Sequence, residues 1–265
     1  MSLLAVDNLT LTAGATPLVD HLSFAIAPGE RLGLIGESGS GKSLTAMSVL
    51  GLLPRTISAT GSVTLAGQSV IGAPDRQLDK LRGTAVACVF QEPLTALDPL
   101  MRLGTQVAEA VRRRAGRDGR SVDVRATVLD LFTQVALPDP GRIARSYPHE
   151  VSGGQRQRVA IAMALACKPD LLIADEPTTA LDVTTQAEIL KLLDRLVRER
   201  GMALLFISHD LPAVAQVVDR VVVLRKGVAV EAGPVAEIFA RPQHDYTQSL
   251  VAAARAFDQA LEGTP

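Results

Sequence analysis

The chain has 265 residues, of which 47% are hydrophobic and 21% are charged, and its formal net charge is −1. This composition predicts a folded globular protein with a sizeable core, and it excludes a disordered chain. The balanced charge gives no overall attraction to nucleic acid, so we expect no such partner. No apolar run is long enough to span a bilayer and the first residues lack a signal-peptide pattern, so we expect a cytoplasmic protein.

The first third of the chain is predicted to contain short strands and one helix. The helix is expected over residues 43–53, because Pro54 cannot continue it. The strands are expected over residues 3–6, 9–12, 22–26, 31–35, 63–65 and 85–90.

The middle of the chain, roughly residues 93–151, differs from its flanks because helical periodicity dominates there, most clearly over residues 105–114 and 122–135. After it, strands and helices alternate. In chain order these elements are expected over residues 171–174, 184–200, 203–207, 212–217 and 220–224. Such alternation predicts an α/β fold, a parallel sheet with helices on both faces, into which a helical segment is inserted.

A glycine-rich segment between the strand at 31–35 and the following helix matches the phosphate-binding pattern G-x-x-x-x-G-K-[S/T]. Its glycines let the backbone wrap closely around phosphate oxygens, and its N–H groups with the helix N-terminus attract an anion. Lys42 would place its charge on the β- and γ-phosphates of a nucleotide, and Ser43 would offer its hydroxyl to Mg²⁺. The alternative is a glycine-rich turn that arose by chance. The segment consists of Gly36, Glu37, Ser38, Gly39, Ser40, Gly41, Lys42 and Ser43.

Two acids follow the apolar strand predicted at 171–174 and precede Pro177. In an open α/β sheet, ligands gather at the carboxyl ends of the strands, so Asp175 could reach a Mg²⁺ ion beside the phosphate-binding segment. Glu176 would then polarise the water that attacks the terminal phosphate. Taken alone, the pair could be an ordinary surface turn.

Two further polar residues follow predicted strands in the same way. His209 comes after the strand at 203–207, where a neutral imidazole could donate to the γ-phosphate and orient the water. Gln91 comes after the strand at 85–90, and its amide could bind Mg²⁺ or the water. A histidine with a purely structural role is the alternative for His209.

The segment from Val151 to Arg158 reads VSGGQRQR and resembles the LSGGQ signature of the ATPase subunits of ABC transporters, with valine in place of the first leucine. The signature precedes a helix, so hydroxyl, N–H groups and helix dipole could face a γ-phosphate. In this family the signature binds the nucleotide held by the other subunit, which implies a dimer closed around two ATP molecules. The residues expected to do so are Ser152, Gly153, Gly154 and Gln155.

Other parts of the family pattern are present in the expected order. The tripeptide Ala180-Leu181-Asp182 resembles the D-loop, Gln91 matches the Q-loop glutamine, and His209 matches the switch histidine. The resemblance implies a P-loop NTPase (RecA-like) core with an N-terminal antiparallel β subdomain and an inserted helical subdomain. We expect the catalytic core over residues 1–92 and 158–240, the helical subdomain over 93–157, and a short tail over 241–265.

The chain departs from the family pattern at the adenine. Family members often stack an aromatic ring on the base from the loop between the first strands, near Ala13 in this chain. The chain has no Trp and only two Tyr, and neither Tyr lies near Ala13. Base stacking contributes about 1–3 kcal/mol per base in nucleic-acid sites. We therefore expect adenine to be held by apolar contacts.

Several longer segments are similar to importers of peptides and nickel. They are the Q-loop segment 90–99, Tyr147–Glu150 before the signature, residues 174–186 around the acids, and the tail 241–250. The resemblance implies a second, different ATPase as partner, two membrane permease subunits and an extracytoplasmic binding protein. It also implies a groove on the helical insert that receives a helix of the permease, at the cytoplasmic face of the membrane.

Three alternatives stay open. Soluble ABC ATPases of phosphonate carbon–phosphorus lyase complexes share the tail motif and need no permease. DNA-repair and translation-factor members usually carry two cassettes or a long coiled-coil insertion, and neither is evident here. The basic cluster at 112–114, with Arg117 and Arg120, could contact nucleic acid, although a solvated helix end or anionic lipid headgroups fit it as well.

Overall fold

The computed structural model describes residues 2–179 and 181–262, without the side chains of residues 94, 95 and 256–262. The chain divides into two compact units, which are described separately. The first comprises residues 1–78 and 203–265, and the second comprises residues 79–202. The described residues contain no helix that is long and apolar enough to cross a membrane.

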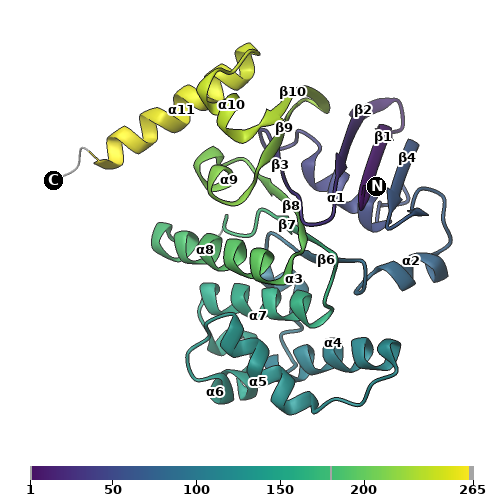
Figure 1. The fold of residues 1–265 in the computed structure, drawn as a ribbon, viewed down its shortest axis with the longest axis vertical. Helices are drawn as coiled ribbons and strands as arrows, with labels where there is room; N and C mark the ends of the chain where they lie inside the picture. Colours follow the sequence, from purple (N-terminus) through teal and green to yellow (C-terminus); the bar gives the residue numbers. More distant parts are fainter. Residues whose placement is uncertain (1, 180, 263–265) are drawn as a thin grey trace. The chain divides into compact units, whose positions relative to one another are not determined.

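The first unit contains an antiparallel sheet with the strand order β2-β1-β4-β5 (Figure 1). Its strands are β1 (Leu4–Ala13), β2 (Thr16–Ile26), β4 (Ile57–Leu65) and β5 (Gln68–Ser69). Alternate residues of β1 are buried, as in a sheet with one face on the core.

The prediction of two strands at 3–6 and 9–12 was wrong, because both belong to β1. The polar pair Asp7-Asn8 suggested a break, but the register shifts there and the strand continues through an irregularity. Asn8 has a φ of 47°, and its N–H donates to the Ser23 hydroxyl at 2.9 Å. Gly61 lies opposite, where a Cβ would be 2.3 Å from the Asn8 carbonyl oxygen, so only glycine permits this approach.

The same unit contains four strands of a second sheet, in the order β10-β9-β3-β8. The strand β3 (Arg31–Ile35) pairs in parallel with both β8 (Ala203–Ser208) and β9 (Arg220–Arg225), and β10 (Val228–Pro234) is antiparallel to β9. β8 is buried throughout, and so is β3 after Arg31, as expected for strands covered on both faces. The edge strand β10 and the helix after it were not predicted.

Four complete helices lie among the described residues of the first unit. They are α1 (Lys42–Leu50), α9 (Leu211–Val217), α10 (Val235–Ala240) and α11 (Asp245–Glu262). α1 is shorter than predicted because Gly51 adopts a left-handed conformation, with φ 63°, and ends it before Pro54. α9 packs on β3 and β8, and α11 packs on α9. The short helix α2 (Asp75–Leu81) spans the boundary between the units.

The second unit contains the parallel pair β6 (Val86–Val89) and β7 (Leu171–Asp175) together with a group of helices (Figure 1). The helix α4 packs against α5, α6 and α7. Its buried residues Leu103, Val107 and Val111 are spaced four apart and so lie on one face. The helices are α3 (Pro93–Ala96), α4 (Leu103–Asp118), α5 (Val124–Gln134), α6 (Pro140–Arg145), α7 (Gly153–Ala166) and α8 (Val183–Arg200), with a 3₁₀ turn at Pro148–Glu150.

Candidate functional site

The phosphate-binding segment forms the connection between β3 and α1, as predicted. Gly36 follows β3 with a φ of 156°, and a Cβ there would lie 2.2 Å from the Leu224 carbonyl oxygen. Gly41 is the N-cap of α1 with a φ of 97°, and a Cβ there would lie 2.6 Å from the Val19 side chain. Both positions require glycine, so the pattern of glycines is dictated by the backbone path of this loop.

The Lys42 ammonium is turned toward the backbone of the loop. Lys42 is only 4% exposed, and its Nζ donates to the carbonyls of Gly36 at 2.7 Å and Glu37 at 2.8 Å. The buried hydroxyl of Ser40 has no protein hydrogen-bond partner in the described part of the chain. Ser43 lies in the first turn of α1, whose N-cap provides no side-chain cap. A buried ammonium, an orphaned hydroxyl and an uncapped helix N-terminus together suit a phosphate ligand.

Two contacts that sequence reasoning missed hold the loop from outside. The Gly227 N–H donates to the Ser40 carbonyl at 3.2 Å. The Glu37 N–H donates to the phenol oxygen of Tyr246 at 2.9 Å, although the two residues are 209 positions apart. Tyr246 lies within the tail motif, which the sequence predicts to be a mark of the subfamily or an ordinary amphipathic helix. No local pattern indicates that this motif touches the loop.

His209 lies one residue beyond β8, and its side chain is exposed. β3 and β8 are parallel neighbours in which Ile35 pairs with Ser208. Gly36 and His209 therefore each follow paired residues at the same edge of the sheet. The structure thus places the predicted histidine beside the start of the phosphate-binding loop, with Asp210 as the N-cap of α9.

In the second unit, the structure brings Gln91 and Glu176 together, as their places after predicted strands suggested. The Gln91 Nε2 donates to a carboxylate oxygen of Glu176 at 3.3 Å, and the Thr179 hydroxyl donates to the same oxygen at 3.0 Å. Glu176 has a φ of 46°, an uncommon conformation for a residue with a side chain. Such conformations persist where surrounding contacts enforce them, and they concentrate at functional sites.

Asp175 ends β7 and is 7% exposed. The negative charge of Asp175 acts on Cys88 of the neighbouring strand β6. Burial raises the pKa of the Cys88 thiol, and the Asp175 carboxylate raises it further. The thiol therefore stays protonated at neutral pH, and Cys88 contributes no negative charge at this edge. Asp175 is the last residue of β7 and is buried, whereas Glu176 follows the strand and is partly exposed.

The signature segment opens α7. The Ser152 hydroxyl accepts the Gln155 N–H at 3.2 Å, while the Gln155 side chain accepts the Ser152 N–H at 3.1 Å, which makes a reciprocal capping box. Gly153 and Gly154 form the first turn. A Cβ on Gly154 would lie 2.6 Å from the Thr185 methyl group, so glycine allows α7 to approach α8 closely.

Asp182 is the N-cap of α8 beside this segment. Its carboxylate accepts the Thr185 N–H at 2.9 Å, and hydrogen bonds from Thr185 hold the pKa of Asp182 below its ordinary value. Its side chain is exposed. A Cβ on Gly153 would lie 3.5 Å from a Leu181 methyl carbon. Ala180, the first residue of the predicted D-loop, lies outside the described residues.

The adenine position expected near Ala13 lies at the end of β1, where Ala13 is exposed and the turn to β2 follows. Val19 of β2 reaches the phosphate-binding loop, because its methyl carbon lies 2.6 Å from the place that a Cβ of Gly41 would take. An apolar residue of β2 is thus adjacent to the loop. No aromatic residue is present between Ala13 and Val19.

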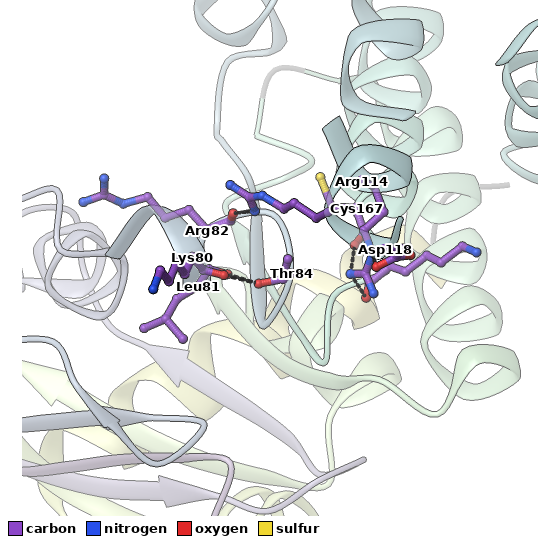
Figure 2. A network of polar contacts seen from close by, with 9 residues as sticks. Lys80, Leu81, Arg82, Thr84, Arg114, Asp118 and Cys167 are labelled. Atoms are coloured by element: carbon purple, nitrogen blue, oxygen red, sulfur yellow. Dashed lines mark hydrogen bonds and ion pairs between the residues drawn. The ribbon is translucent and has the colours of Figure 1, made fainter. Parts of the chain in front are cut away.

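A cavity of about 430 Å³ lies on the helical part of the second unit. Figure 2 shows part of its wall: Arg114 donates to the Cys167 carbonyl at 2.6 Å and pairs with Asp118 at 3.0 Å. Arg117 donates to the Arg82 carbonyl at 2.6 Å. Two residues of the predicted basic cluster, Arg114 and Arg117, therefore donate hydrogen bonds to backbone carbonyls of the same unit. The residues that line the cavity include Ala96, Asp98, Met101, Glu109, Arg113 and Arg117.

The glycine-dependent loop between a buried parallel strand and a helix, together with the acids Asp175 and Glu176 at the end of β7, defines a P-loop NTPase. A family model described as "ABC transporter" matches residues 19–179, more than half of the chain, and the chain belongs to this family. It is 48% identical to the peptidoglycan transport ATP-binding protein YejF of Agrobacterium fabrum, over 95% of this chain and 47% of that protein. It is 47% identical to the probable peptide ABC transporter ATP-binding protein y4tR of Sinorhizobium fredii, over 89% of this chain and 70% of that protein.

Among solved structures, the dimeric ATP-binding cassette MJ0796 bound to ADP and Pi is 28% identical, with a TM-score of 0.76 over 88% of this chain and 98% of that chain. The predicted α/β P-loop fold is therefore confirmed. The chain spans about half the length of YejF.

Proposed function

We propose that this chain binds and hydrolyses ATP as the ATPase subunit of an ABC importer, whose cargo is a di- or oligopeptide, or nickel or a metal chelate. The observation that carries the proposal is the loop 36–43, where glycine-only conformations surround a buried lysine and an orphaned hydroxyl. The names of the relatives, a peptidoglycan transport protein and a probable peptide transporter protein, support a peptide as the cargo.

The loop would hold the phosphates. Lys42 already points its ammonium at the loop carbonyls and would turn to the β- and γ-phosphate oxygens. Ser43, Asp175 and Gln91 carry the oxygen donors that Mg²⁺ prefers, and would hold that ion. Bound Mg²⁺ would offset the negative charge that develops on the transferred phosphoryl group.

Glu176 would act as the general base. A base must be held within hydrogen-bond reach of the proton that it removes. Thr179 and Gln91 both donate to one oxygen of this carboxylate, which orients the carboxylate. His209 would donate to the γ-phosphate and hold the water in line.

The signature would act on the nucleotide of a second subunit. The Ser152 hydroxyl accepts a bond from its own helix, so its proton stays available to donate to a phosphate oxygen. The N–H groups of Gly153 and Gly154 and the side chain of Gln155 stand at the same helix end. Asp182 would link the two nucleotide sites. A different ATPase chain is the proposed partner, in a heterodimer.

The remaining partners would be two membrane permease subunits and an extracytoplasmic binding protein, with this chain at the cytoplasmic face of the membrane. The cavity of about 430 Å³ on the helical part is the groove we assign to a helix of the permease. It joins residues of the Q-loop segment, Ala96 and Asp98, to the apolar Met101. Closing of the ATPase pair would move that helix, and hydrolysis would release it.

The proposal is tested by affinity purification of tagged Glu176→Gln protein from the native host, in detergent with MgATP. We expect ATP turnover to fall about 10²- to 10⁴-fold, the usual contribution of a general base, while ATP binding persists. Two integral membrane proteins and a second ATPase should copurify. The exposed Glu199, on α8, supplies the matched control as Glu199→Gln, whose turnover should equal that of the wild type.

Two outcomes contradict the proposal. Undiminished hydrolysis by Glu176→Gln would remove Glu176 from its role as base. Copurification of soluble enzyme subunits without any membrane protein would replace the importer by a soluble complex, such as one that cleaves carbon–phosphorus bonds.

A further inference from the structure

The tail motif after α10 ends on the outside of the phosphate-binding loop. Tyr246, in the first turn of α11, is only 5% exposed, and its phenol oxygen accepts the Glu37 N–H at 2.9 Å. Its ring lies under the Arg225 guanidinium, whose Cζ is 5.1 Å from the ring centroid. The ring is thus held from one side by the end of β9, while the phenol reaches the loop.

The segment before Tyr246 is itself fixed by hydrogen bonds. The Glu231 carboxylate of β10 accepts the N–H groups of Gln243 at 2.8 Å and His244 at 3.1 Å. Burial opposes the ionisation of Glu231, but the nearby Thr247 hydroxyl and these N–H groups lower its pKa, so the carboxylate is charged at neutral pH. The His244 Nδ1 in turn accepts the Tyr246 N–H at 3.1 Å. The position of the phenol is therefore set by the sheet and not by α11 alone.

The contact between Tyr246 and Glu37 is linked to Lys42, because Glu37 is hydrogen-bonded to both residues. The N–H of Glu37 is bonded to Tyr246, and the carbonyl of the same residue accepts from Lys42 Nζ at 2.8 Å. The loop is held a second time where the Gly227 N–H donates to the Ser40 carbonyl. Anchoring Glu37 thus holds the carbonyl that positions the lysine.

We propose that Tyr246 is a positioning residue for nucleotide binding, which holds the loop 36–43 in its binding conformation through Glu37 without touching the nucleotide. A loop that is already ordered binds its ligand without the cost of ordering. The C-terminal segment 241–250 therefore sets the affinity for ATP, and a partner that displaced it would weaken that affinity. This inference rests on the proposal that the loop binds ATP.

The test compares wild-type protein with Tyr246→Phe, which keeps the buried ring and removes the acceptor. We expect the Kd and KM for ATP to rise about three- to tenfold, the range for one lost hydrogen bond, with kcat unchanged within about twofold. The kcat is spared because Gln91 and Glu176 are not altered. Hydrogen exchange of the segment 36–43 without nucleotide should become faster in the variant.

Arg255→Ala is the matched control, because Arg255 ties α11 to the Phe239 carbonyl at 2.6 Å, at the end of α10 and not in the loop. It should leave the KM for ATP and the exchange of the loop unchanged. Unchanged KM and exchange in Tyr246→Phe, in a protein whose wild type binds ATP, would overturn the inference alone. If the wild type and Lys42→Ala bind ATP equally poorly, the proposed function itself fails.

Discussion

Two glycine-rich segments each open a helix in this chain, and their helix ends are satisfied differently. At the phosphate-binding loop, the N-cap of α1 is Gly41 in a left-handed conformation, and no side chain caps the helix. At the signature, the N-cap of α7 is Ser152, which exchanges hydrogen bonds with Gln155. The first helix end has no side-chain cap, whereas the second is capped by its own residues.

The difference explains how two similar segments can have different tasks. The loop depends on conformations that only glycine adopts, and on contacts with distant parts of the chain such as Leu224, Gly227 and Tyr246. The signature depends on a local box of four residues, and it needs glycine only where α7 approaches Thr185. The loop is therefore more sensitive to substitution than the signature, whose helix start is capped by its own residues.

The largest effect that separates the two segments is expected from replacing a glycine in each. Gly36→Ala should lower the free energy of unfolding by about 3 kcal/mol, because the Cβ would lie 2.2 Å from the Leu224 carbonyl and the φ of 156° disfavours a side chain. Gly153→Ala should leave stability unchanged or slightly raised, since its Cβ meets only Leu181 at 3.5 Å. Urea unfolding of both variants measures the difference, and equal losses would contradict the comparison.

A smaller effect is expected at the cap of the signature helix. Ser152→Ala should cost about 1 kcal/mol of unfolding free energy, the usual loss for an N-cap serine. We propose that the loop and not the signature holds the chain's own nucleotide, so the Kd for ATP of the isolated chain should not change. Hydrolysis by the assembled dimer should fall. Titration of ATP into the isolated chain checks this, and Ser152→Thr should recover the lost stability. A weakened Kd in the isolated chain would show that the signature acts within its own subunit.

The smallest effect concerns the neighbouring cap of α8 and its pH dependence. Hydrogen bonds from Thr185 hold the pKa of Asp182 below its ordinary value of about 3.9. The folded-state pKa is depressed, so the cap's contribution is present above the unfolded pKa and is lost as pH falls through the folded pKa. In Asp182→Asn, the unfolding free energy should therefore decline less steeply below about pH 4 than in the wild type. Parallel slopes in pH-dependent unfolding would exclude the cap as a source of this stability.

Most elements of the fold could be predicted because they are long and strongly patterned. The strand β3, the helices α4, α5 and α8 and the strands β7 to β9 lie close to their predicted places. The errors fell where tertiary pairing overrides local polarity: Asp7-Asn8 did not interrupt β1, since the opposing Gly61 accommodates the irregularity. The missed β10 and α10 lack a clean apolar period, because β10 is an edge strand and largely exposed.

The sequence also predicts which residues of the candidate site come together, but not the details of their geometry. Gln91 and Glu176 each follow a buried strand, and parallel strands bring their carboxyl ends to one edge, so their contact follows from topology. That Thr179 would share the same carboxylate oxygen, and that Glu176 would adopt a positive φ, could not be inferred. Those details depend on the path of the chain after β7, and periodicity carries no information on it.

The sequence by itself determined the local motifs of this protein: a glycine loop with Lys42 and Ser43, the acids Asp175 and Glu176, and a second glycine-containing helix start at residues 151–155. These are local patterns, in which residue type and spacing alone dictate what the backbone and side chains can do. The tertiary structure decided how the loop is held, through Gly227 and through Tyr246, which is 209 residues from its partner Glu37. A contact over that separation depends on which strands pair and how the last helix packs, and no spacing in the sequence encodes it.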